Sequence, residues 1–398
     1  MTQSSDQSSE QQERTRILHK LYSIPTEALD TERVRWCMEQ IPKVIPPYPE
    51  QRSGRGIIIC AGGRQRLLQA YAMLSYLRRE LGCTLPVELI YVTDIEMQAP
   101  CIELFESELD VRCIDARALI ESYPYTEPKY LRGYMIKPFA LLTSSFEEVL
   151  LIDCDNIPVR DPSFLFEMDG YREHGAVFWR DFPGLRDPSG KEKIFEILDP
   201  AKTTIPKHAH ETGQVVMDTR KLWASLHLVW FLNNNHEIFY KVGIHGETDL
   251  YQICITMAGQ SFFEMPYAPK TIGSHTQFAE GIHGHSLGQC DLEGEVLFAH
   301  RCCDDSYGVT AGALHGSDEF TTSSKRISLP IPWDWVTAEA ELPGIKVDAN
   351  NKWILVPKSE PRDVPESLKR CYAHVCATIE HLDAHELHRF PEDPAAIK

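Results

Sequence analysis

The sequence predicts an α/β fold built on a parallel sheet, because strand-like apolar runs alternate with helical patterns. Residues 56–60 (Gly-Ile-Ile-Ile-Cys) form a short β-branched run of the kind that is buried on both faces of a sheet. Further strand-like runs follow at 87–92 and 111–114, and apolar residues recur at helical spacing between them, over 65–81 and 100–109. This alternation is typical of parallel strands joined by crossover helices. We expect this half of the chain to bind a nucleotide.

Four regions are expected along the 398 residues. Residues 1–12 are rich in Ser and Gln and are expected to form a disordered tail. Residues 13–54 carry helical spacing and end in a proline-rich linker, so they are expected to form a helical extension. Residues 55–303 hold the strand–helix alternation and form the main domain. Residues 304–398 lose the pattern, and we expect an irregular C-terminal wrap there with a closing helix.

The charge balance argues against a nucleic-acid partner. The chain carries 40 basic and 58 acidic residues, a formal net charge of −18, and this field repels a phosphate polymer unless a basic patch overrides it. A single nucleoside diphosphate is still compatible, because a divalent cation neutralises it locally. The sequence shows no export signal and no apolar stretch of about 18–20 residues. We therefore expect a cytoplasmic protein without a membrane span.

The run at 150–155 (Leu-Leu-Ile-Asp-Cys-Asp) places Asp153 and Asp155 at the end of an apolar strand. Because side chains alternate along a strand, both acids are expected on one face, about 6–7 Å apart. They would lie at the carboxyl edge of the sheet, where open α/β sheets bind their ligands. Carboxylates there suit Mg²⁺ or Mn²⁺ bound together with substrate phosphates. The alternative is a strand-ending acid followed by a turn, with Asn156 capping the next segment.

The wider sequence closely resembles the fungal α-mannosyltransferase family that includes the yeast α-1,3-mannosyltransferases. The resemblance runs from about residue 56 to about residue 301 and is carried by KPFALL at 137–142, SSFEEVLLIDCDNIP at 144–158, GAVFWRDF at 175–182, ETGQVVMD at 211–218 and HGETDL at 245–250. It implies a glycosyltransferase A-type fold for residues 55–303, with a mixed sheet flanked by helices, and makes this region the catalytic domain.

The resemblance also implies an activity. It implies metal-dependent, retaining transfer of a hexose to an acceptor hydroxyl, which gives an α-glycosidic bond. The donor it implies first is GDP-mannose, with Mn²⁺ or Mg²⁺ as the cofactor. The alternative within the class is a UDP-sugar donor carrying glucose, galactose or N-acetylglucosamine. The acceptor stays open among glycan, lipid, protein and metabolite.

The resemblance assigns the metal site. Asp153 would contact the ribose or share the metal, and Asp155 would bind the metal beside the diphosphate. A late histidine commonly completes such a site, and His300 ends the apolar run at 296–300; its alternative is a hydrogen-bonded structural role. Three more histidines compete in a Gly/His-rich segment, 273–288, that is expected to be a mobile lid: His275, His283 and His285.

Donor binding is expected of the turn after the first strand. Its glycines allow close approach of a nucleotide and its arginine can meet a phosphate, although a simple tight turn explains the pattern equally well; the turn consists of Ala61, Gly62, Gly63 and Arg64. Lys137 is expected to neutralise a phosphate, with a solvated lysine as the alternative. Cys154, between the two acids, is the last donor-site candidate.

Catalytic candidates near the transferred sugar lie on later strands and turns: Asp181, Glu211, Gln214, Glu247 and Asp249. Asp249 also suits the first turn of a helix, where the dipole favours an acid. No single nucleophile emerges, and attack by the acceptor on the same face is the common proposal for retaining enzymes of this fold. The rival from another class is a sugar nucleotidyltransferase, for which the turn after the first strand is a poor phosphate loop. A non-catalytic sugar-binding scaffold is disfavoured by the number of acids retained.

Overall fold

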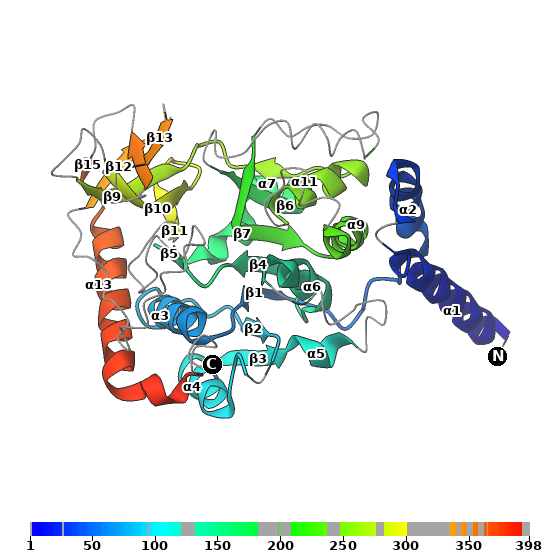
Figure 1. Cartoon of the computed structure of the whole chain (residues 1–398), viewed down its shortest axis with the longest axis horizontal. Coiled ribbons are helices and arrows are strands. Elements are labelled where there is room, and N and C mark those ends of the chain that lie inside the picture. The colour runs from blue at the N-terminus through cyan, green and yellow to red at the C-terminus, as the bar shows by residue number, and fades with distance from the viewer. Residues whose placement is uncertain are drawn as a thin grey trace.

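The computed structural model describes most of the chain up to residue 300 and several segments beyond it (Figure 1). The described residues are 2–25, 28–93, 95–120, 131, 133–181, 198, 208–236, 247–275, 282–300, 335–339, 344–347, 353–356, 362–363 and 365–391.

Within these residues the main sheet has seven strands, in the order β3-β2-β1-β4-β7-β6-β8. They are β1 (Arg55–Cys60), β2 (Val87–Tyr91), β3 (Val111–Asp115), β4 (Glu148–Ile152), β6 (Ala176–Arg180), β7 (His210–Asp218) and β8 (Phe263–Glu264). The first four in chain order pair in parallel, β7 is antiparallel to both β4 and β6, and β8 is parallel to β6. The predicted α/β fold with a mixed sheet flanked by helices is confirmed.

Strand β1 shows why both faces of this sheet are covered. Ile57 and Ile59 face one hydrophobic cluster and Ile58 faces the other, as alternation along a strand requires. The first cluster contains residues of α3 (Arg64–Arg79), α4 (Ala99–Leu109) and α13 (Glu366–His381). The second contains residues of α1 (Thr2–Tyr22), α2 (Thr31–Val44), α6 (Ile136–Thr143), α9 (Trp223–Asn234) and α11 (Thr248–Met257). The result is a three-layer arrangement of helices, sheet and helices.

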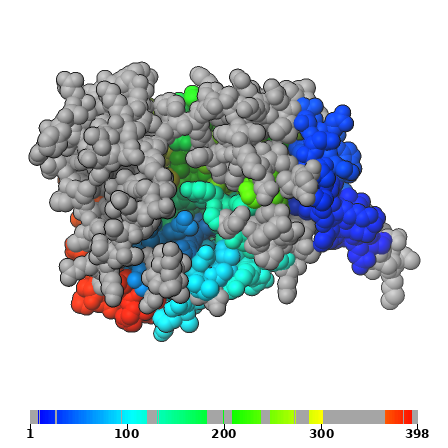
Figure 2. All heavy atoms as spheres, viewed as in Figure 1, coloured from blue at the N-terminus to red at the C-terminus, as the bar shows by residue number. Residues whose placement is uncertain are grey.

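Shorter helical segments complete the described part of the chain. They are α5 (Ala116–Leu119), α7 (Asp169–His174), the 3₁₀ segments η4 (Gly133–Met135) and η5 (Pro162–Glu167), and, after α13, a π segment at Leu382–Glu386 and a 3₁₀ segment at Leu387–Arg389. Helices α1 and α2 lie at one end of the molecule and α13 at the other (Figures 1 and 2). Within the described residues, no helix combines the length and the apolar character that crossing a membrane needs.

A second, antiparallel sheet lies against the end of the first. Its strands are β5 (Asn156–Pro158), β9 (Lys270–His275), β10 (Ile282–Cys290), β11 (Val296–His300), β12 (Trp335–Glu339), β13 (Gly344–Val347), β14 (Trp353–Val356) and β15 (Arg362–Asp363). Strand β5 follows β4 after three residues and pairs with β11, so the chain passes from one sheet to the other at Asp153–Asp155. This crossing point holds the candidate site.

Two segments differ in structure from what the sequence suggested. Residues 2–12 are helical and belong to α1; the later turns of α1 are anchored by buried Leu18 and Leu21, and the Gln- and Glu-containing run before them contains no helix breaker. The described part of segment 273–288, where a mobile lid was expected, lies in strands β9 and β10. Gly288 is closely packed there, because a Cβ on it would lie 3.1 Å from Ile272 and Val296 side-chain atoms.

The expected irregular wrap is also only partly right. Strand β12 pairs with β9, and β14 pairs with β10, so parts of 304–398 extend the second sheet. These pairings join segments far apart in the sequence, and no local pattern announces them. The closing helix is present as α13. The aromatic and proline-rich stretch up to residue 334 lies outside the described residues.

Candidate active site

Asp153 and Asp155 lie on a turn after β4, which ends at Ile152. The expectation that strand alternation would align them was therefore wrong. The turn is held by backbone hydrogen bonds instead: the Asp153 N–H donates to the Gly213 carbonyl at 2.8 Å, and the Asn156 N–H donates to the Asp153 carbonyl at 3.0 Å. The side chain of Asn156 donates to the same Gly213 carbonyl at 2.8 Å. The two acids are thus fixed against the neighbouring strand β7.

His300 completes a possible set of metal ligands with these acids. One ligand atom from each of Asp153, Asp155 and His300 lies within 4.8 Å of the others. His300 Nε2 is 3.3 Å from Asp155 Oδ1 and 4.0 Å from Asp153 Oδ2. The pairing of β11 with β5 brings His300 opposite Asn156, which explains how a residue so late in the chain reaches the turn. Two carboxylates and an imidazole are a donor set that fits Mn²⁺ or Mg²⁺ with phosphate oxygens.

The other nitrogen of His300 faces Glu211. The distance from His300 Nδ1 to Glu211 Oε1 is 3.1 Å, so the carboxylate orients the imidazole as the outer partners of metal-bound histidines do. Burial alone would lower the pKa of His300, but Glu211 and Asp155 raise it well above its usual value. Burial raises the pKa of Asp153 to about 6, although Lys137 opposes the shift. The carboxylates around His300 therefore favour positive charge at this enclosed position.

Lys137 is buried beside this cluster, and the alternative of a solvated lysine is excluded. Its side chain is 7% exposed, and Nζ lies 2.7 Å from Asp153 Oδ1 and 3.3 Å from Glu247 Oε1. It also donates to the Thr212 carbonyl at 3.2 Å. Burial alone would lower the pKa of Lys137, but Asp153 and Glu247 raise it well above its usual value. The lysine stays charged at the point where the two halves of the sheet meet.

Three of the catalytic candidates lie around Lys137 and His300. Glu247 accepts from the Thr212 hydroxyl at 3.0 Å, and Gln214 accepts from the Asn156 amide. Glu211 Oε2, Glu247 Oε2 and Gln214 Nε2 are buried, and among the described residues none has a hydrogen-bond partner. Buried polar atoms normally have hydrogen-bond partners. Three buried polar atoms without one, beside Lys137 and His300, therefore indicate where a polar ligand binds. Asp249 is buried in the first turn of α11, as its helix-dipole alternative predicts.

The remaining candidates lie less centrally. Asp181 follows β6, where its N–H donates to the carbonyl of Ala209. The Cys154 thiol contacts the amide oxygen of Gln69 at 3.7 Å and belongs to the apolar cluster on the α3 side of the sheet. The two aspartates beside it therefore carry the polar chemistry of the turn.

The turn after β1 is shaped by its neighbours. A Cβ on Gly62 would lie 2.6 Å from Glu96 Oε2, and Gly63 has a φ of 81° before α3, while Ala61 is buried. Arg64 donates to the Pro391 carbonyl at 2.8 Å, so its guanidinium ties down the C-terminal segment in this structure. The side chains of the competing histidines in 273–288 lie outside the described part.

Two residues that shape the site were not among the candidates: Thr212 and Gly213. A Cβ on Gly213 would lie 2.5 Å from two atoms of the His300 ring. A glycine inside a strand often marks close approach of another group, and this signal was available in the sequence. Thr212 carries no comparable signal, because its contacts come from Lys137 of α6 and from Glu247, directly before α11.

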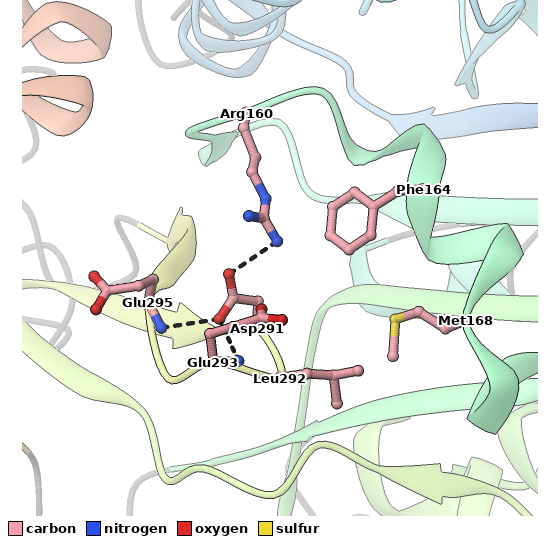
Figure 3. A pocket seen from close by; sticks show the side chains of 7 residues that line it. All are labelled: Arg160, Phe164, Met168, Asp291, Leu292, Glu293 and Glu295. Carbon is pink, nitrogen blue, oxygen red and sulfur yellow. Dashed lines mark hydrogen bonds and ion pairs between the residues drawn. The ribbon is translucent and has the colours of Figure 1, made fainter.

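A separate hollow of about 500 Å³ lies at the far end of β5 and β11 (Figure 3). The buried acid of this hollow, Asp291, already has partners. It pairs with Arg160 at 2.8 Å and accepts from the backbone N–H groups of Glu293 and Glu295, each at 2.9 Å. Arg160 covers the ring of Phe164, 4.4 Å from its centroid. The polar cluster around Asp153, rather than this hollow, has the unpaired groups that a polar ligand requires.

Comparison with known proteins places the chain in a family. Its residues 54–204 and 191–291, together more than half of its length, match the family model described as "Mannosyltransferase putative". Among curated relatives, the α-1,2-mannosyltransferase MNN2 of Saccharomyces cerevisiae is 26% identical over 322 residues, which cover 69% of this chain and 52% of the relative. MNN21 of Candida albicans is 32% identical over 154 residues, 37% of this chain and 23% of the relative.

The chain therefore spans about half, or less, of the length of these relatives. The names of these relatives give an α-1,2 linkage, not the α-1,3 linkage of the yeast enzymes in the family that the sequence resembles. Among solved structures, the mannosyltransferase Ktr4p of S. cerevisiae is similar over 61% of this chain and 81% of its own, with a TM-score of 0.35 and 11% identity. That likeness is too distant to carry an argument. The expected fungal-type family is confirmed by the family model: the chain belongs to this mannosyltransferase family.

Proposed function

We propose that the protein is a retaining, metal-dependent glycosyltransferase that moves mannose from GDP-mannose to an acceptor hydroxyl and forms an α-glycosidic bond. The observation that carries the proposal is the convergence of Asp153, Asp155 and His300 within 4.8 Å, beside the buried charge of Lys137. Membership of the mannosyltransferase family and the names of the relatives support the donor sugar. The cytoplasmic location stays a prediction.

One group of site residues is expected to act on the diphosphate of the donor, and a second group on its sugar. Asp153, Asp155 and His300 would hold Mn²⁺ or Mg²⁺, which when bound supplies charge neutralisation for the leaving nucleoside diphosphate. Glu211 holds the His300 ring in orientation. Lys137 would place a second positive charge beside the diphosphate, where negative charge develops as its bond to the sugar breaks.

Glu211, Gln214 and Glu247 surround the position expected for the transferred sugar. Each has a buried polar atom without a partner among the described residues, suited to hydroxyl groups of a hexose. The carboxylates also stabilise positive charge on the sugar ring as its bond to the phosphate lengthens. Attack by the acceptor hydroxyl on the face that the diphosphate leaves retains the α configuration, and the hydroxyl proton passes to the departing diphosphate oxygen.

A donor panel tests the proposal. GDP-mannose, UDP-glucose, UDP-galactose and UDP-N-acetylglucosamine are each incubated with the protein, with Mn²⁺, Mg²⁺ or a chelator, and release of nucleoside diphosphate is measured. We expect release from GDP-mannose that requires the ion. In Asp155→Asn we expect a loss on the order of 100-fold, because a metal ligand is removed.

The matched control is Asp169→Asn, since Asp169 is an exposed acid in the first turn of α7. It is expected to behave as the wild type. Preference for a UDP-sugar would contradict the donor, and full activity in chelator or in Asp155→Asn would contradict the metal site.

A further inference from the structure

The carboxylate of Glu96 lies between the ends of β1 and β2. Glu96 belongs to the segment that follows β2, and a Cβ on Gly62, two residues past β1, would lie 2.6 Å from its Oε2. The two strands are parallel, so the carboxylate lies at the carboxyl edge of the sheet, where open α/β sheets bind their ligands. Gly62 leaves room for the acid because it has no side chain.

Backbone groups hold Glu96 in this position. Its Oε2 accepts from the Val92 N–H at 3.2 Å. Its own N–H donates to the Thr93 carbonyl at 3.0 Å, and its carbonyl accepts from the Gly63 N–H at 2.9 Å. A side chain supported in this way loses little conformational freedom when it binds a ligand.

The other carboxylate oxygen of Glu96, Oε1, is available to a ligand. Among the described residues, none donates a hydrogen bond to Oε1, and no Lys, Arg or His forms an ion pair with the carboxylate. The side chain is partly exposed, so a ligand can reach this oxygen. Stabilisation of the turn explains the role of Oε2 but gives no role to Oε1. An acid without a cation repels a diphosphate, so the ligand group that suits it is an uncharged N–H donor.

The strand order sets the distance between Glu96 and the candidate metal site. Asp153 follows β4, and β4, β1 and β2 are neighbours in that order. The carboxyl ends of β4 and β2 are therefore about 10 Å apart, which is two strand spacings. Between them, Cys60 ends β1 close enough to Lys137 for the charge of the lysine to act on its thiol. A nucleoside diphosphate with its phosphates at the metal site thus reaches Glu96 with its base.

We propose that Glu96 recognises the base of the donor and selects guanine over uracil. This inference rests on the proposed function and deepens it. The Watson–Crick edge of guanine carries two adjacent donors, the N1–H and the 2-amino group, and a carboxylate accepts from both. Uracil presents one N–H between two carbonyl oxygens, which a carboxylate repels. Ile95, directly before Glu96, is 61% exposed and offers apolar contact to the face of a planar base.

The test measures the affinity of the full chain for three nucleotides by isothermal titration calorimetry with Mn²⁺ present: GDP, UDP and inosine diphosphate, whose base lacks the 2-amino group. We expect the wild type to bind GDP about ten-fold more tightly than inosine diphosphate. Glu96→Gln keeps an oxygen for the Val92 N–H and replaces the other oxygen with a donor. In this variant we expect GDP affinity to fall about ten-fold, to the level of inosine diphosphate, with UDP affinity unchanged.

The control is Glu103→Gln, which removes the same charge from an acid of α4 whose side chain is 76% exposed. It is expected to bind all three nucleotides as the wild type does. Equal GDP affinity in Glu96→Gln and the wild type would overturn the base contact. Equal weakening of GDP and UDP would also overturn it, because Glu96 would then only support the turn.

Failure of the proposed function looks different from failure of the base contact. If the nucleotide affinities follow the expected pattern but the wild type releases no GDP from GDP-mannose, mannose transfer is contradicted and the base contact stands. If the wild type releases GDP from GDP-mannose but Glu96→Gln binds GDP equally well, the base contact alone is contradicted. A wild type that binds none of the three nucleotides contradicts both.

Discussion

The position of His300 depends on a residue without a side chain. Gly213 lies in β7, two residues after Glu211. Its carbonyl accepts hydrogen bonds from the Asp153 N–H and from the Asn156 side chain. The His300 ring fills the space where a Cβ would stand. One glycine thus sets the distance between the acidic turn and the histidine.

Gly213→Ala is expected to weaken Mn²⁺ binding about ten-fold, because the new methyl would lie 2.5 Å from His300 ring atoms and displace the ring. Titration with Mn²⁺, followed by electron paramagnetic resonance, measures the affinity. Gly288→Ala is the control, since it adds a methyl to another strand glycine with milder contacts of 3.1 Å or more. Equal Mn²⁺ affinity in Gly213→Ala and the wild type would show that His300 is not a ligand.

At the residue scale, the sequence predicted which residues form the site better than it predicted where their side chains point. The grouping of Asp153, Asp155 and His300 follows from acids after one strand and a histidine at the end of another, and the structure brings them together. The orientations of the Arg64 and Cys154 side chains could not be predicted from the sequence, because tertiary contacts decide where side chains in turns point. Arg64 meets a carbonyl that lies 327 residues later.

At the scale of elements, α9 is unusual in being buried almost throughout its length. It contains His227, which is 0% exposed and packs edge-on to Trp223 with ring centroids 4.7 Å apart. Burial lowers the pKa of His227 from 6.5 to about 3, with a smaller contribution from Arg52. The folded protein keeps this imidazole neutral over a pH range in which the unfolded chain binds a proton.

This shift predicts a pH-dependent stability. The contribution of His227 is complete above pH 6.5 and is lost progressively as the pH falls toward about 3, because only the unfolded state takes up the proton there. Between pH 7.5 and 5.5 the wild type should lose about 1.4 kcal/mol more unfolding free energy than His227→Phe. Urea unfolding at both pH values measures this difference. His388→Gln, at an exposed histidine, should keep the wild-type pH dependence; the same dependence in His227→Phe would contradict the assignment.

The elements themselves were predictable where their signal is local. Strand β1, with its three isoleucines, and β4 were visible as apolar runs, and α3 by its spacing. Strands β9 and β10 were not, because glycine and histidine are poor strand formers and the pairing partner supplies the stability. The start of helix α2 at Thr31 is set by Asp30, which caps it by accepting from the Arg33 N–H.

At the scale of the whole molecule, the site lies where two sheets meet. Strand β4 belongs to the first sheet, β5 and β11 belong to the second, and the acidic turn connects them. The expected boundary near residue 303 does not separate independent parts, because Ile379 of α13 belongs to the core cluster that covers β1. The family resemblance predicted the first sheet, and the long-range pairing of the later strands lay beyond any local pattern.

The net charge of −18 also limits where an anionic donor can bind. An acidic molecule binds an anionic nucleotide sugar only where positive charge is concentrated, and Lys137 together with a divalent ion provides that place. The central claim is therefore about where the ion lies.

A crystal structure with Mn²⁺ and GDP, with anomalous diffraction measured at the manganese absorption edge, tests that claim most directly. We predict one strong anomalous peak about 2.1 Å from ligand atoms of Asp155 and His300, with the diphosphate on its open side and Asp153 adjacent. A GDP-bound structure with no peak there, or with these side chains turned away from the ion, would contradict the account.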